Sequence, residues 1–132
     1  MMEKFTTINT GIRELLSQAT AKNKVDDELI NYLNSDDRIL YLRYNQDILV
    51  GCIGIQLMEN NLIEIKHLAT QKAYRYKRIG SNMIAYIEQA YAPSKLFAET
   101  DKEAVGFYKK SGFNINSLGE KYPGVERFNC VK

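Results

Sequence analysis

Histidine, cysteine, proline and tryptophan are rare or absent in this chain. Its 132 residues include one histidine, two cysteines, two prolines and no tryptophan. A zinc site built from histidine and cysteine would need nearly all of these residues to converge on one point. A catalytic serine triad would need His67 beside a nucleophile turn, and the sequence has no GxSxG. The composition therefore argues against zinc chemistry and serine hydrolysis, and we expect no metal.

Long apolar runs and a dominant charge are also missing. No stretch approaches the ~20 apolar residues that a membrane-spanning helix needs, and the first residues lack the apolar core of a secretion signal. A net charge of +2 argues against a nucleic-acid-binding protein. Cys52 and Cys130 stand far apart in apolar contexts, which favours buried, reduced thiols. We therefore expect a cytoplasmic protein that binds neither nucleic acid nor a membrane.

The remaining composition is that of an ordinary globular chain, with 45% apolar residues and no repeat or linker. The length fits one domain over residues 1–132. The hydrophobic periodicity predicts an α/β fold in the order strand, helix, helix, three strands, helix, strand, helix, two strands.

Two helices are expected between the first and second strands. Apolar spacing predicts the first helix at about 11–22. The second helix is expected to have Asp26 as its N-cap and to bury Leu29, Ile30 and Leu33.

The strand predicted from LIEIKHLAT, residues 62–70, has a break in its alternation. Ile63 and Ile65 share one face, but strict alternation would place Leu68 on the other face. A β-bulge at Lys66 or His67 would restore the phase. Such a bulge would also free backbone N–H and C=O groups for a partner other than a strand.

Four cations stand where this strand is expected to turn into a helix: Lys72, Arg75, Lys77 and Arg78. A helix start presents unpaired N–H groups and the positive end of the helix dipole, which together favour a phosphate. Neither GxxxxGK[ST] nor GxGxxG is present. The junction thus predicts a phosphorylated ligand that is not held by either nucleotide fingerprint, and a solvated cationic face is the alternative.

Two segments, HLATQKAYRYKRIGSNMI and ETDKEAVGFYKKSGF, together resemble the signature segments of the GNAT superfamily of N-acetyltransferases. The first is similar to the pyrophosphate loop (Q/R)xxGx(G/A), whose marked places hold Arg75, Arg78 and Gly80. The second is similar to the helix motif NxxAxx(F/L)YxxxGF, and the matching residues are Ala104, Phe107, Tyr108, Gly112 and Phe113. Either motif alone is weak, but their order, spacing and elements agree over essentially the whole chain.

Two residues depart from the family pattern. Arg78 stands where glycine usually permits close backbone approach to the pyrophosphate. Its side chain must therefore point outward, towards another phosphate, or the affinity for the coenzyme must fall. Asp101 stands where asparagine is usual, which removes an amide donor and adds negative charge near the coenzyme arm.

The resemblance implies a GNAT fold, with helices flanking a mixed and mostly antiparallel sheet, and acetyl-CoA as co-substrate. It implies that the pyrophosphate meets the N–H groups of Arg75, Tyr76, Lys77, Arg78, Ile79, Gly80 and Ser81. The pantetheine arm would pair like a strand with Leu68, Ala69 and Thr70. Phe107 would provide an apolar wall, and Lys110 a cation for an outer phosphate. The acyl group would lie between IEIKHLAT and KLFAE, two strands that splay apart in the family.

Direct acetyl transfer needs a neutral amine, a stabilised oxyanion and a proton for the departing thiolate. By resemblance Tyr108 is the proton donor, since a phenol with a pKa of about 10 can return a proton to a thiolate; a packed aromatic is the alternative. Glu64 is the first candidate for the base, because it lies sixteen positions before Gly80, the spacing found in the histone-acetylating branch. His67, Glu99 and water are the other candidates for the base.

The sequence thus predicts an N-acetyltransferase that moves an acetyl group from acetyl-CoA to a primary amine in a ternary complex. A coenzyme-A-binding sensor without turnover and a nucleic-acid-binding domain are the rival interpretations. The acceptor, a small molecule or a peptide amine, is expected near residues 22–37 and 116–126, and a homodimer is left open. Acidic residues in the first range either attract a cationic amine or serve as ordinary helix caps: Asp26, Asp27, Glu28, Asp36 and Asp37.

Overall fold

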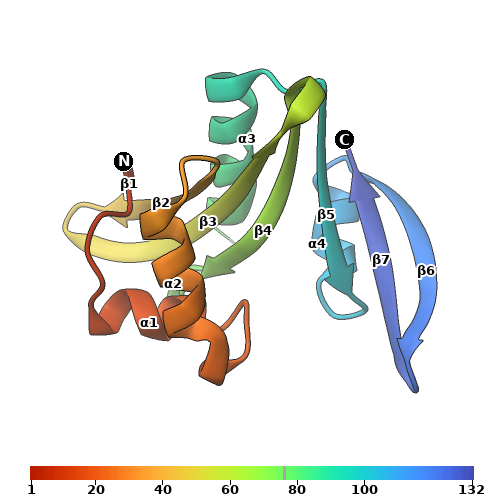
Figure 1. The fold of residues 1–132 in the computed structure, drawn as a ribbon, viewed down its shortest axis with the longest axis horizontal. Helices are drawn as coiled ribbons and strands as arrows, with labels where there is room; N and C mark the ends of the chain where they lie inside the picture. The colour runs from red at the N-terminus through yellow and green to blue at the C-terminus, as the bar shows by residue number, and fades with distance from the viewer. Residues whose placement is uncertain (76) are drawn as a thin grey trace.

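A seven-stranded sheet runs through the computed structural model, which describes residues 1–75 and 77–132 (Figure 1). The strands are β1 (Met2–Lys4), β2 (Arg38–Asn45), β3 (Ile48–Met58), β4 (Leu62–Thr70), β5 (Lys95–Asp101), β6 (Asn114–Tyr122) and β7 (Val125–Val131). The α-helices are α1 (Thr10–Leu16), α2 (Val25–Asn34), α3 (Ile79–Tyr91) and α4 (Val105–Lys110). Short 3₁₀ turns are η1 (Lys22–Lys24), η2 (Glu59–Asn61) and η3 (Lys72–Tyr74). The order of strands and α-helices is the predicted one.

The strands lie in the order β1-β2-β3-β4-β5-β7-β6. β4 and β5 are parallel, and the other neighbouring strands are antiparallel. This mixed, mostly antiparallel sheet confirms the expected fold class. None of the helices in the described ranges is long and apolar enough to cross a membrane.

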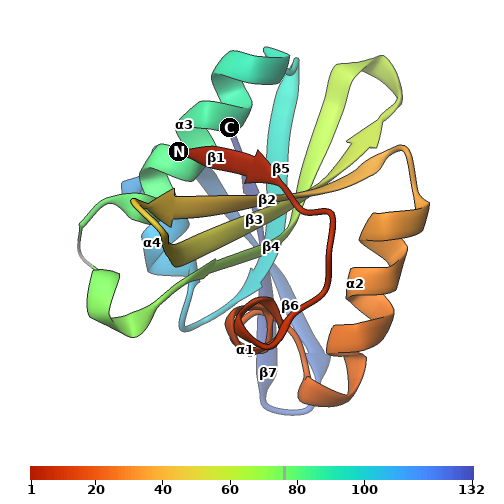
Figure 2. The same ribbon diagram turned by 90° about the vertical axis from the view of Figure 1, so that its left-hand side faces the viewer.

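Helices cover the sheet from both sides (Figure 2). Buried residues of α1 and α2 pack with one apolar cluster, and those of α3 and α4 pack with another. β3 runs between the two clusters, and its residues 50–55 are all buried. Cys52 and Cys130 are buried free thiols, as expected.

α1 and α2 differ from the sequence expectation. α1 already ends at Leu16, and Asp26 lies inside the first turn of α2 instead of capping it. Ile30 and Leu33 were predicted to be core residues but are 46% and 43% exposed. Val25, Leu29 and Tyr32 form the buried face instead, at the i, i+4, i+7 spacing of a helix.

The break in the alternation of β4 is a β-bulge, as predicted. Gly54 of β3 pairs with His67 and Ile55 pairs with Ile65, so Lys66 is the additional residue. The bulge returns Leu68 to the apolar cluster that contains Ile65.

β4 and β5 pair along only part of their length. Leu62–Ile65 pairs with Lys95–Ala98, and no later pair joins the two strands in the described ranges. Figure 1 shows the two ribbons parting from the top of the view downward. The splay expected between these strands is therefore confirmed.

The C-terminal third has the expected elements. β5 ends at Asp101, and a turn at residues 102–104 leads into α4 at Val105. Gly112 follows the helix with a φ of +91°, the left-handed conformation expected of a glycine that ends a helix. β6 and β7 then form the predicted hairpin.

Candidate functional site

The parting of β4 and β5 leaves one edge of β4 free. Residues 66–70 remain beside β3, but their opposite edge has no strand partner in the described part of the chain. Backbone groups on this edge can therefore bind an extended ligand in the manner of a strand. Leu68, Ala69 and Thr70, the residues predicted to hold the pantetheine arm, lie here.

Tyr108 lies in the apolar cluster beside the point where the strands part. Its side chain is 6% exposed and shares the cluster with Ile65 and Ala98, the last pair that joins β4 to β5. The rings of Phe107 and Phe113 each meet the Tyr108 ring edge-on, with centroids 5.2 Å apart. Burial raises the pKa of the Tyr108 phenol above its ordinary value. The group therefore keeps its proton at neutral pH and is suited to donate it.

Glu64 lies on the other face of β4. It alternates with Ile63 and Ile65, which belong to the cluster of Tyr108, so its side chain points away from them. One carboxylate oxygen is 3.6 Å from Nζ of Lys66, and the side chain is 23% exposed. The two predicted catalytic residues thus lie on opposite faces of the sheet and do not form a direct pair.

The other two candidate bases have surroundings that weaken them as bases. His67 is buried, its Nδ1 lies 2.5 Å from the Tyr32 hydroxyl, and burial lowers its pKa from 6.5 to about 4. Glu99 is hydrogen-bonded by Nζ of Lys121 at 2.8 Å and Nε of Arg127 at 3.2 Å. The Lys121 hydrogen bond is the largest cause that lowers the pKa of Glu99. Both groups bind protons more weakly than an unperturbed histidine or glutamate.

The start of α3 has the features expected of an anion site. Helical hydrogen bonding begins with the Asn82 N–H, which donates to the Arg78 carbonyl, so residues 79–81 form the first turn. Arg78 itself adopts the left-handed conformation, with φ 60° and ψ 21°. Its exposed side chain agrees with the expectation that it points outward. Glycine adopts this conformation without strain, which accounts for the glycine of the motif.

The remaining residues predicted to hold the coenzyme surround this turn. A Cβ at Gly80 would stand 3.0 Å from Phe107 Cζ and 4.0 Å from Thr70 Oγ1, so β4, α3 and α4 meet there. Arg75 donates from Nη2 to Gln18, and Nζ of Lys77 lies 5.4 Å from the centroid of the Tyr74 ring. Ser81 is in the first turn of α3, and Lys110 is exposed in the last turn of α4. Tyr76 lies outside the described residues.

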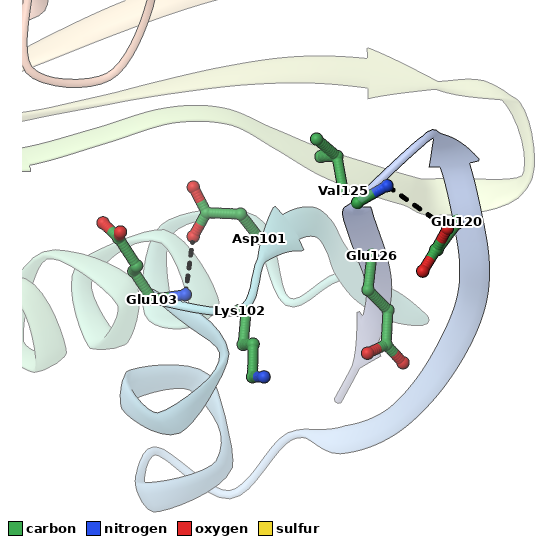
Figure 3. Close-up of a pocket in the computed structure, with 7 residues that line it drawn as sticks. Asp101, Lys102, Glu103, Glu120, Val125 and Glu126 are labelled. Atoms are coloured by element: carbon green, nitrogen blue, oxygen red, sulfur yellow. Dashed lines mark hydrogen bonds between the residues drawn. The ribbon is translucent and has the colours of Figure 1, made fainter.

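Asp101 stabilises the turn that leads into α4 (Figure 3). Its Oδ1 accepts the N–H groups of Glu103 at 3.1 Å and Ala104 at 2.9 Å. The sequence around this turn favours Thr100 or Asp101 as the N-cap of the helix, but this is wrong: Asp101 caps the preceding turn, and the N-cap of α4 is Ala104. An asparagine Oδ1 can accept the same two bonds, so the aspartate preserves this part of the motif's geometry.

A cavity of about 310 Å³ lies beside Asp101, between the β5–α4 turn and the tip of the β6–β7 hairpin (Figure 3). Its lining residues are Asp101, Lys102, Glu103, Glu120, Gly124, Val125 and Glu126. The hairpin tip falls in the range 116–126 that was expected to bind the acceptor. In the other expected range, Asp26 pairs with Arg13 and Glu28 pairs with Arg38.

Comparisons with known proteins agree with this geometry. The family model described as an acetyltransferase (GNAT) domain matches residues 8–123. The uncharacterized N-acetyltransferase in the lysA 3′ region of Bacillus methanolicus is 22% identical over 100 residues, which cover 76% of this chain and 83% of that protein. Similar crystal structures include two that contain coenzyme A or acetyl-CoA. An aminoglycoside 6′-N-acetyltransferase complexed with coenzyme A has a TM-score of 0.83 and 19% identity, covering 100% of this chain and 96% of the other. A GNAT family acetyltransferase from Elizabethkingia anophelis with acetyl-CoA bound has a TM-score of 0.75 and 19% identity, covering 99% and 95%.

Proposed function

The chain belongs to the GNAT family of acetyltransferases, and we propose that it carries out its transfer in the gap between β4 and β5 with Tyr108 as proton donor. It is an N-acetyltransferase with acetyl-CoA as co-substrate. The observation that supports this site best is the parting of β4 from β5 at Ile65 and Ala98, within the apolar cluster that holds Tyr108. Two buried free thiols fit a reducing cytoplasm, where we place the protein.

The described residues fit the co-substrate along its length. The first-turn N–H groups at Ile79, Gly80 and Ser81, with the cations before them, suit the pyrophosphate. The free edge at residues 68–70 suits the amide groups of pantetheine. Phe107 provides the apolar wall beside Gly80, and Lys110 provides a cation for an outer phosphate.

The reaction is a direct attack of the neutral amine on the thioester carbonyl. A C–N bond forms, the C–S bond breaks, and Tyr108 gives its proton to the departing sulfur. The proton lost by the amine leaves through water on the face of Glu64, and Tyr108 is reprotonated. The same burial that raises the pKa of the Tyr108 phenol also destabilises a thiolate beside it, so the proton transfer is not strongly uphill.

The acceptor approaches the face of the sheet opposite to Tyr108. Leu96 and Ala98 of β5 are buried towards α3 and α4, whereas Phe97 and Glu99 point to the other face. On that face α1 packs on β3 and β4, and α2 on β2. In Figure 1 both helices lie to the left of the gap between β4 and β5, and α2 crosses in front of the sheet. A primary amine therefore enters between α2 and the β6–β7 hairpin, and the acidic cavity at the hairpin favours one that carries additional positive charge.

Thiol release from acetyl-CoA across a library of amines tests this function. Tyr108→Phe is expected to bind the coenzyme as the wild type does but to turn over at least about tenfold more slowly, a loss of about 1.4 kcal/mol of transition-state stabilisation. The matched change on the other face, Glu64→Gln, reports whether the carboxylate or water alone removes the amine proton. Unchanged turnover in Tyr108→Phe would remove this residue from the mechanism. Saturable coenzyme binding without thiol release for any amine would instead favour a sensor.

A further inference from the structure

We propose that Tyr32 and His67 are positioning residues whose buried hydrogen bond locks the bulge of β4 in the shape that receives the coenzyme arm. Through this bond α2, which lies on the face opposite to Tyr108, becomes part of the coenzyme-binding machinery. The inference rests on the proposed function, because it assumes that the free edge of β4 holds the pantetheine arm.

The bond joins α2 to the residue that follows the bulge. His67 comes directly after Lys66, the additional residue, and pairs with Gly54 of β3. The Tyr32 hydroxyl lies 2.5 Å from His67 Nδ1, and the two side chains are 6% and 7% exposed. A bulge has fewer ladder hydrogen bonds to fix its shape than a regular strand has. A buried side-chain bond at the next residue supplies a constraint that the ladder lacks there.

Neighbouring residues on two sides restrict the position of the Tyr32 ring and its hydroxyl. Gly54 lies so close to this hydroxyl that any Cβ at Gly54 would overlap it. On the other side, the Arg38 guanidinium stands 5.0 Å from the centroid of the Tyr32 ring and donates from Nη2 to Glu28 at 2.7 Å. Arg38 Nε is buried without a hydrogen-bond partner among the described residues. The fold thus tolerates an unsatisfied donor while holding the ring in place.

The protonation of the pair favours positioning over acid–base chemistry. Burial keeps the phenol of Tyr32 protonated and the imidazole of His67 neutral near pH 7. The Glu28 carboxylate beside Nε2 favours the tautomer with the proton on Nε2, and in this tautomer Tyr32 donates to Nδ1. The imidazole proton then resides on Nε2, which faces Glu28 Oε2 at 3.8 Å. In this state neither ring nitrogen has a free lone pair for the acceptor amine. His67 therefore shapes the bulge and does not serve as the base.

Two tyrosine-to-phenylalanine variants test the lock against a purely structural role. Tyr32→Phe removes the bond to His67. Tyr41→Phe is the control, because the Tyr41 hydroxyl also makes a 2.5 Å bond, to Tyr91, which is partly buried and joins β2 to α3. Both variants should lower the melting temperature. At a temperature well below both transitions, only Tyr32→Phe should raise KM and Kd for acetyl-CoA, by roughly five- to tenfold for one lost buried hydrogen bond.

A conservative change at the partner completes the test. His67→Asn places an acceptor oxygen near the position of Nδ1 and should keep KM for acetyl-CoA within about twofold of the wild type, whereas a catalytic base could not be replaced in this way. Equal KM values in Tyr32→Phe and Tyr41→Phe, or loss of turnover in a folded His67→Asn, would overturn the lock. A titration of the wild-type protein tests the proposed function separately. If the wild type does not bind acetyl-CoA, the proposed function itself is wrong.

Discussion

Arg78 adds a positive charge to the loop proposed to bind the coenzyme, and its backbone conformation lowers stability. Its φ of 60° and ψ of 21° lie in the left-handed region, which costs a residue with a Cβ about 1 kcal/mol or more. Arg78→Gly should therefore raise the free energy of unfolding by about 0.5–1 kcal/mol, after the greater flexibility of glycine in the unfolded chain is deducted. Urea unfolding measures this change.

The matched control for Arg78 is alanine. Arg78→Ala removes the same charge but keeps the backbone strain, so it should show no gain in stability. Both variants should bind coenzyme A more weakly at low salt, because each lacks one cation. Equal stability of the glycine and alanine variants would show that the left-handed conformation is not strained here.

The buried imidazole of His67 makes the stability of the fold depend on pH. Its pKa in the folded protein is about 4, below the 6.5 of an exposed histidine. The unfolded chain therefore binds the proton first, and stability that is complete above pH 6.5 is lost as the pH falls towards 4. The full loss is about 3 kcal/mol. Urea unfolding from neutral to mildly acidic pH should show a slope that His67→Asn reduces; parallel slopes in the two proteins would contradict this origin.

At the scale of elements, the sequence predicted those features that depend on residues close together in the chain. The position of Leu68 predicted the bulge, and Gly112, the glycine of the helix motif, follows α4 with a positive φ. The buried face of α2 was misjudged because Ile30 and Leu33 are more apolar than Tyr32, which nevertheless takes the core position. Tyr32 can be buried because its hydroxyl hydrogen-bonds with His67 and because Gly54 has no side chain in its way. Neither His67 nor Gly54 is close to Tyr32 in the sequence.

Two leucines on α2 test this assignment of its faces. Leu29 is fully buried, so Leu29→Ala should lower the free energy of unfolding by about 2–5 kcal/mol. Leu33 is 43% exposed, so Leu33→Ala should change it by about 0.5 kcal/mol or less. The two substitutions are chemically identical, and each serves as the control for the other in denaturant unfolding. Similar losses of unfolding free energy in the two variants would support the buried face predicted from periodicity, which includes Leu33.

At the scale of the whole molecule, the sequence motifs cover the proposed coenzyme side of the site but not the proposed acceptor side. The free edge of β4, the start of α3 and Tyr108 come from continuous segments with recognisable patterns. By contrast, the ion pairs of Glu99 with Lys121 and Arg127 arise from the pairing of β5, β7 and β6. The acidic cavity likewise depends on how the hairpin folds beside the β5–α4 turn. These contacts join residues that are far apart in the chain, so no regular pattern in the sequence predicts them.

The charges of this cavity predict a preference among acceptors. In the double variant Glu120→Gln/Glu126→Gln, glutamine keeps an oxygen for the Gly124 N–H and the Ser117 hydroxyl but removes both negative charges. KM should rise roughly three- to tenfold for a triamine probe such as spermidine, and should stay within about twofold for a monoamine and for acetyl-CoA. Added salt should raise KM for the triamine in the wild type and have less effect in the variant.

The exposed Glu3→Gln on β1 is the control for a general change in charge. If KM for the triamine rises equally in the control, or in neither variant, the acceptor does not carry its additional charge at the hairpin.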